Sequence, residues 1–142
     1  MSQHMRYTNI INSIRNNSSR HNFEVLSEDE IKRELEVEGI PKEYIDFLRE
    51  VGYGTVNGTY FNFYSGLVEV DEILGHLFDE DSHPELKDVL LFGDNFSGDA
   101  VGFLTTDNWA IVEIWHDDDL SINPTEEKTF EEFVVTMFEK FN

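Results

Sequence analysis

Apolar residues recur at helical spacing near both ends of this sequence and at strand spacing between them. Residues 7–14, 41–51 and 129–141 place apolar side chains three and four positions apart, which is typical of amphipathic helices. Strand-like runs lie between them, at 60–64, 68–70, 89–92, 100–104 and 109–115. Helices, then a series of strands, then a helix indicate an α+β fold rather than alternating βαβ units. We therefore predict a single domain with a mostly antiparallel sheet of about five to six strands, packed with helices from the N- and C-terminal ends.

Local signals mark where the first helices begin and end. Ser27 and Glu30 have the spacing of a capping box, which starts a helix. Gly39 ends that helix, and Pro41 begins the next one at a position where a missing N–H group costs nothing. Gly52 interrupts the apolar spacing, so we expect the second helix to end there.

The aromatic content indicates a packed core. Twelve Phe, five Tyr and two Trp in 142 residues exclude a disordered acidic tail, which would have no core to build. We expect residues 1–22 to form an N-terminal helical extension, of which 1–4 could be a tag remnant, and 23–142 to form the domain. The residues predicted to lie in the core are Tyr44, Phe47, Leu48, Trp115, Phe130 and Phe133.

The charge is strongly acidic and unevenly distributed. Thirty acidic residues oppose ten basic ones, for a formal net charge of −20. Residues 1–22 contain three bases and no acid, whereas residues 66–127 contain seventeen acids and one base, Lys87. Such a charge keeps a protein soluble and attracts basic partners, while the phosphates of nucleic acid would be repelled. We therefore expect a basic protein partner and no direct nucleic-acid ligand.

The sequence presents no catalytic or cofactor motif. There is no cysteine, which excludes a disulfide framework, a thiolate zinc site and a Cys nucleophile. Gly93 and Gly98 have the glycine interval of a phosphate-binding loop, but the lysine that must follow is missing. His116 and Asp117 could be an acid–base pair, but adjacent strand residues point to opposite faces. We expect no enzyme activity, no catalytic residue and no cofactor.

Two acidic runs, 79–81 and 117–119, raise the alternative of a weak divalent-cation site. Neither run follows the calcium-loop pattern of alternating ligands with a central Gly and a terminal Glu, so solvated loop acids are favoured over a metal site. The sequence also has no apolar run long enough for a signal peptide or a membrane helix. We therefore expect a cytoplasmic protein without membrane contact.

The acidic turns are the candidate partner-binding surface. If these turns share one edge of the sheet, they form a negative face that speeds association with a basic protein. The residues predicted to bind the partner are Asp79, Glu80, Asp81, Asp94, Asp99, Asp117, Asp118 and Asp119. Both 79–81 and 117–119 remain candidates for the centre of this surface.

Four motifs in sequence order resemble the SUKH superfamily, which includes the fungal cell-wall-assembly regulator and many bacterial relatives. They are the helical segment 27–50 with its glycine-rich exit, the turn 91–99, the strand 112–117 and the final helix. The resemblance covers roughly residues 27–140. The residues that carry it are Gly39, Pro41, Tyr44, Phe47, Leu48, Gly52, Gly54, Gly93, Asp94, Gly98, Asp99, Trp115, Phe130 and Phe133.

The resemblance implies an α+β fold and, for bacterial members, an immunity role. Such proteins bind and neutralise a toxin domain, commonly a nuclease, that is delivered between neighbouring cells. Nuclease domains are basic because they hold phosphates, so an acidic inhibitor suits this target. The alternative is a non-catalytic regulatory or scaffold module that binds an intracellular protein. In either role we expect a monomer or a weak homo-oligomer.

Overall fold

The computed structural model describes residues 6–75, 77–79 and 81–140. The elements largely follow the predicted order, but a strand precedes the second helix and two short helices lie within the series of strands. The helices are α1 (Thr8–Asn16), α2 (Glu28–Leu35), α3 (Lys42–Glu50), α4 (Val70–Leu74), the short 3₁₀ helix η1 (Pro84–Asp88) and α5 (Phe130–Glu139). The strands are β1 (Asn22–Glu24), β2 (Tyr53–Val56), β3 (Phe61–Glu69), β4 (Val89–Asp94), β5 (Ala100–Leu104), β6 (Ala110–Trp115) and β7 (Ser121–Pro124).

The strands form one antiparallel sheet in which each strand pairs with the next along the chain, from β1 to β7. This arrangement confirms the α+β prediction. The sheet has seven strands rather than the predicted five to six. The strands missed include β1 at one edge and β7 at the other, which have three and four residues. Edge strands this short contain too few alternating residues to give a sequence pattern.

The predicted signals act at the starts of α2 and α3 and at the end of α3, whereas α2 ends at Leu35, four residues before the predicted stop at Gly39. Ser27 accepts a hydrogen bond from the Glu30 N–H, and the Glu30 side chain accepts one from the Ser27 N–H, which confirms the capping box. Pro41 is the N-cap of α3. Gly52 ends this region with φ at +99°, and a Cβ atom there would lie 1.8 Å from the carbonyl oxygen of Glu24. Only glycine therefore lets β1 approach the chain after α3.

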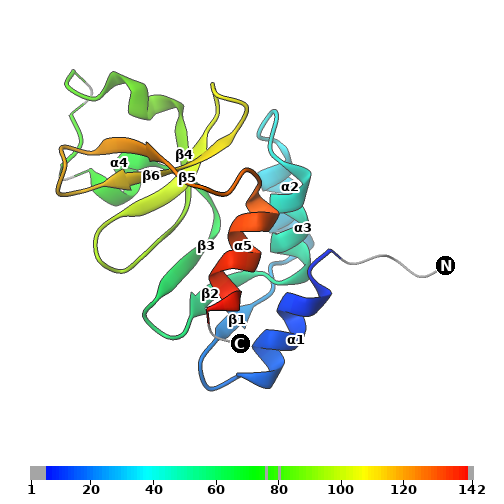
Figure 1. Cartoon of the computed structure of the whole chain (residues 1–142). Helices are drawn as coiled ribbons and strands as arrows, with labels where there is room; N and C mark the ends of the chain where they lie inside the picture. The colour runs from blue at the N-terminus through cyan, green and yellow to red at the C-terminus, as the bar shows by residue number, and fades with distance from the viewer. Residues whose placement is uncertain (1–5, 76, 80, 141–142) are drawn as a thin grey trace.

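The sheet separates two apolar layers (Figure 1). Side chains of α1, α2, α3 and α5 share one buried cluster with the facing side chains of β2 to β6. On the other face, α4 and η1 cover a second cluster with Val89, Leu91 and Ile114 among its members. Strand alternation explains the division, since Val112 and Ile114 point to the second cluster while Ile111 points to the first.

The larger cluster is built mainly from aromatic rings. Phe92 lies 5.0 Å from Phe130 and 5.3 Å from Phe133, measured between ring centroids. Tyr44 meets Phe130 edge to face at 5.1 Å. Such edge-to-face contacts add to the burial of apolar area. The structure thus confirms the predicted core positions, with one exception: Tyr44, Phe47, Leu48, Phe130 and Phe133 are buried.

Trp115 is the exception, because its side chain is 38% exposed and the prediction that it lies in the core is wrong. It shares the helix-covered face of β6 with Ile111, which is buried in the larger cluster. Four residues further along a strand is about 13 Å. At that distance Trp115 lies beyond the helical cover, and its indole N–H donates to Oε1 of Glu113 at 3.1 Å.

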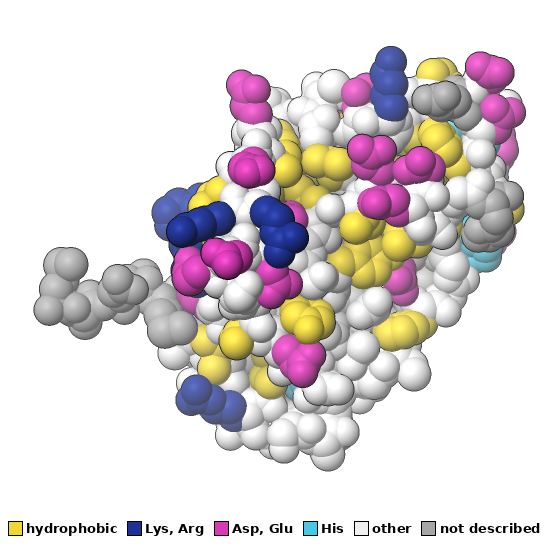
Figure 2. All heavy atoms as spheres, turned by 180° about the vertical axis from the view of Figure 1, so that it is seen from behind, with side chains coloured by type: hydrophobic (Ala, Val, Ile, Leu, Met, Phe, Trp, Pro, Cys, Tyr) yellow, Lys and Arg dark blue, Asp and Glu magenta, His cyan; other side chains and the backbone are white. Residues whose placement is uncertain are grey.

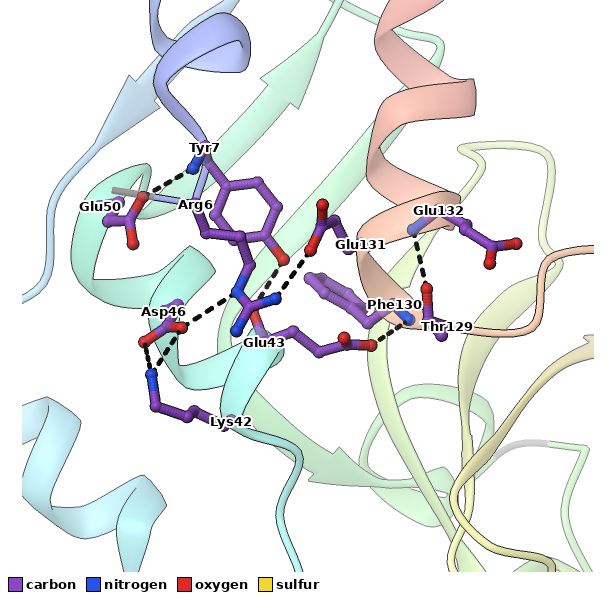
Figure 3. A network of polar contacts seen from close by, with 10 residues as sticks. All are labelled: Arg6, Tyr7, Lys42, Glu43, Asp46, Glu50, Thr129, Phe130, Glu131 and Glu132. Atoms are coloured by element: carbon purple, nitrogen blue, oxygen red, sulfur yellow. Dashed lines mark hydrogen bonds and ion pairs between the residues drawn. The ribbon is translucent and has the colours of Figure 1, made fainter. Parts of the chain in front are cut away.

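Polar contacts attach the N-terminal helix to α3 and α5 (Figure 3). Arg6 forms ion pairs with Asp46 of α3, at 3.1 Å, and with Glu131 of α5, at 2.8 Å. The Tyr7 hydroxyl donates to the carbonyl oxygen of Glu43 at 2.8 Å. Tyr7 is buried in the same cluster as α3 and α5. Residues before the predicted domain start at 23 therefore contribute to its core.

Candidate partner-binding surface

Three acidic loops meet at one end of the sheet. Hairpins β4–β5 and β6–β7 belong to one antiparallel meander, so the turns that close them lie at the same end. The loop between α4 and η1 reaches the same place, on the left of Figure 1 and away from α1 to α3. We call the described residues of these loops, 77–79, 81–83, 95–99 and 116–120, the acidic edge.

His83 joins the α4–η1 loop to the β6–β7 loop. Its Nε2 atom lies 3.1 Å from Oδ1 of Asp119. Its Nδ1 atom accepts from the Asp79 N–H at 3.2 Å and lies 3.1 Å from the Asp79 carbonyl oxygen. The ring therefore has partners in both protonation states. The hydrogen bond to Asp119 raises the pKa of His83, although the side chain is buried.

His116 joins the β4–β5 loop to the β6–β7 loop. Its ring Nδ1 atom lies 2.7 Å from Oδ1 of Asp99, and its backbone N–H donates to the same oxygen at 3.0 Å. Burial opposes ionisation of Asp99, but the bonds from His116 prevail and lower the pKa of that carboxyl. Gly98 has φ at +105°, and a Cβ atom there would lie 2.8 Å from the imidazole, so glycine is required beside this pair.

The structure brings most of the predicted binding residues to this edge. Those with exposed side chains are Asp79, Asp81, Asp117, Asp118 and Asp119. Asp99 is half-buried in its pair with His116. Asp94 serves the fold, since it accepts from the Tyr64 hydroxyl at 2.7 Å and from the Phe96 N–H at 3.0 Å. Glu80 lies outside the described residues. That these acids bind a partner stays a prediction.

Positive charge is concentrated at the other end of the molecule. Seven of the ten bases precede residue 50. The Lys and Arg side chains with salt bridges in the described structure, Arg6, Lys42 and Arg49, pair with acids of α2, α3 and α5. On the face opposite to that of Figure 1, lysine and arginine side chains gather mainly on the left, and acidic side chains extend to the right (Figure 2). The acidic edge therefore keeps its negative charge.

The edge also holds one group of metal-ligating atoms. Asp99, His116 and Asp117 each offer a ligand atom, and these atoms lie within 4.8 Å of one another. Oδ1 of Asp99 already accepts two hydrogen bonds from His116, so the arrangement has a structural cause without an ion. The preference for solvated acids over a cation site stays a prediction.

A cavity of about 570 Å³ adjoins the acidic edge. Its lining includes Asn95 and Ser97 of the β4–β5 loop, which are shared with the edge. The cavity is also lined by Tyr60, Glu113, Glu126, Glu127, Met137 and Lys140. Sequence reasoning did not identify its three glutamates as a group. The available signal was Glu113, which interrupts the apolar alternation of β6 on the helix-covered face.

Among the helices of the described residues, none is long and apolar enough to span a membrane.

Comparison with known families gives a match. A SUKH family model described as SMI1-KNR4 cell-wall matches residues 27–134, which is more than half of the chain. The matched segment begins at the Ser27 cap and ends within α5, so it includes the acidic edge and six of the seven strands. No curated protein matches the sequence.

Proposed function

Since the chain belongs to the SMI1-KNR4 family of the SUKH group, we propose that it is an immunity protein that binds and neutralises a basic toxin domain. The acidic edge would contact the toxin, and a nuclease is the toxin class that this charge suits best, because nucleases present positive charge to phosphates. Binding there would cover the groove through which the toxin holds its substrate.

The convergence of three acidic loops is the observation that carries this proposal. The α4–η1 and β6–β7 loops carry exposed carboxylates, the β4–β5 loop adds the half-buried Asp99, and no Lys or Arg side chain pairs with these acids within the described structure. A one-signed surface of this kind steers a basic protein during encounter and fixes its orientation.

Binding explains the edge better than catalysis does. The two groups there with shifted pKa values, His83 and Asp99, owe their shifts to partners that hold the loops together. Structural hydrogen-bond networks perturb pKa values as well as catalytic centres do. The contacts between the loops therefore account for both shifts without a catalytic role.

Co-expression with the toxin domain encoded beside this gene tests the proposal. We expect a stable complex and rescue of growth. The triple variant Asp117→Asn/Asp118→Asn/Asp119→Asn should weaken the complex roughly tenfold, at a few tenths to one kcal/mol per charge. The matched variant Glu36→Gln/Glu38→Gln/Glu139→Gln changes the net charge equally at exposed sites elsewhere and should bind like the unmodified protein. Absence of both complex and rescue would refute the proposal.

A second candidate is a non-catalytic regulatory module that binds an intracellular protein. The description of the matching family as cell-wall favours it. Gene neighbourhood separates the two candidates, because an adjacent secreted toxin supports immunity. A neighbourhood of cell-wall genes without a toxin would support regulation.

A further inference from the structure

The cavity beside the acidic edge lies where the sheet emerges from under α5. Phe133 and Met137 of α5 form one wall, while Tyr60 lies before β3 and Glu126 and Glu127 follow β7. We call this hollow the α5 groove. Its volume of about 570 Å³ is that of a site for a ligand or for a few side chains of a protein.

Glu113 lies on the floor of the α5 groove. It pairs across the strands with Val101 of β5 and with Asn123 of β7, on the face that the helices cover elsewhere. Val101 is buried in the core cluster, whereas Glu113 is half-buried and charged. A carboxylate on the covered face of a central strand is costly unless a cation or hydrogen-bond donors meet it.

The carboxylates of the groove have no cationic partner in the described structure. Glu113 accepts one hydrogen bond, from the indole N–H of Trp115. Lys140 is the base of the groove, and its Nζ atom donates instead to the Tyr60 hydroxyl at 2.6 Å and lies 5.2 Å from the centre of the Tyr60 ring. Glu113, Glu126 and Glu127 therefore present unpaired negative charge to whatever enters.

One exposed aromatic residue lines the groove, and two others adjoin its lining through a hydrogen bond or in sequence. Tyr60 is 37% exposed, and Trp115, which bonds to Glu113, is 38% exposed. Phe96 is 48% exposed and lies between two lining residues of the β4–β5 loop. Aromatic rings beside acids suit guanidinium and ammonium groups, which stack on the rings and pair with the carboxylates. Exposed aromatics of this type also anchor protein–protein interfaces.

We propose that the α5 groove binds a segment of the partner protein that carries arginine or lysine side chains. Charge complementarity selects this occupant, since three unpaired glutamates line the groove. Continuity with the acidic edge through Asn95 and Ser97 places the segment within the same interface. The inference rests on the proposed function and specifies how the partner is recognised: the edge attracts it, and the groove holds one basic segment.

A hexa-arginine peptide is the probe for the groove, titrated by calorimetry at about 0.15 M salt, where long-range attraction is largely screened. The variant Glu113→Gln/Glu126→Gln/Glu127→Gln should weaken binding roughly tenfold. The variant Glu36→Gln/Glu38→Gln/Glu139→Gln makes the same change of net charge outside both the groove and the acidic edge, and should weaken peptide binding less than about threefold. If the groove variant unfolds, the double variant Glu126→Gln/Glu127→Gln leaves Glu113 of β6 unchanged. Its affinity for the peptide should still fall several-fold.

Equal weakening by the two triple variants, or no binding of the peptide to the unmodified protein, would overturn the groove assignment. The same variants in the co-expression assay separate this inference from the proposed function. A toxin complex that is unaffected by the groove variant overturns the assignment of the groove as a binding site and leaves the proposed function intact. Peptide binding at the groove without any toxin complex supports the groove and overturns the immunity role.

Discussion

Two buried tyrosines of the core differ in the hydrogen bonding of their hydroxyl groups. Tyr7 and Tyr44 are each 1% exposed. The Tyr7 hydroxyl donates to the carbonyl oxygen of Glu43 at 2.8 Å, whereas the Tyr44 hydroxyl has no hydrogen-bond partner in the described structure. Burial raises the pKa of both hydroxyls, so both stay protonated. The same chemical group is therefore satisfied at one position and costly at the other.

This difference predicts opposite results for the same substitution. Tyr44→Phe removes an unpaired hydroxyl and should leave the free energy of unfolding unchanged or raise it by about 1 kcal/mol. Tyr7→Phe removes the hydrogen bond to the Glu43 carbonyl and should lower the free energy of unfolding by about 0.5–1.5 kcal/mol. Urea denaturation of both variants measures the two values. A greater loss for Tyr44→Phe than for Tyr7→Phe would contradict the hydrogen bonding described here.

His83 makes the stability of the acidic edge depend on pH. Its pKa is raised above the ordinary 6.5 by the bond to Asp119, so folding favours the protonated ring. The stabilisation is fully present below pH 6.5 and is lost as pH rises through the raised pKa. Asp119→Asn should flatten the fall in unfolding free energy over this window, and asparagine suits the positive φ of 53° there. Asp117→Asn should leave the fall in unfolding free energy as it is in the unmodified protein. Identical pH profiles for both variants would exclude the His83–Asp119 pair as the source of this pH dependence.

At the scale of elements, α3 organises the core. Tyr44, Ile45, Phe47 and Leu48 are all buried along this nine-residue helix. On its outer side, Asp46 forms an ion pair with Arg6 of the segment before α1 (Figure 3). Glu43 accepts from the Phe130 N–H at 2.7 Å, at the start of α5. One short helix thus connects both ends of the chain.

Leu48→Ala tests the packing of this helix. Leu48 is fully buried, so its truncation should lower the free energy of unfolding by about 2–5 kcal/mol. Leu35→Ala on α2 is the matched control, because Leu35 is 49% exposed and should lose less than about 1 kcal/mol. A loss below about 1 kcal/mol for Leu48→Ala in a denaturant melt would mean that α3 is not packed as described.

The order of elements could be predicted because each long element has its own apolar period and caps. Ser27, Pro41 and the glycine after α3 act within a few residues, where sequence and structure are directly linked. Trp115 could not be placed, because its exposure depends on where α5 stops covering β6. The contact between the α4–η1 loop and the β6–β7 loop could not be predicted either, because His83 and Asp119 are 36 residues apart in the sequence.

At the scale of the whole molecule, the chain separates its charges along its length. The first 49 residues carry seven of the ten bases, and the loops at the other end of the molecule carry exposed acids. Beside those loops the sheet leaves a groove in which carboxylates and aromatic rings are accessible. A basic partner would therefore approach the loop end, and orientation would follow from the charge distribution before close contact is made.

The dependence of partner affinity on salt tests this account most directly. The dissociation constant of the complex with the neighbouring toxin domain would be measured from about 0.05 to about 0.5 M salt, where screening shortens the reach of exposed charges. We expect affinity to fall at least tenfold across this range, and the fall to be smaller for Asp117→Asn/Asp118→Asn/Asp119→Asn. An affinity that is the same at low and high salt would contradict a role for the acidic edge in binding.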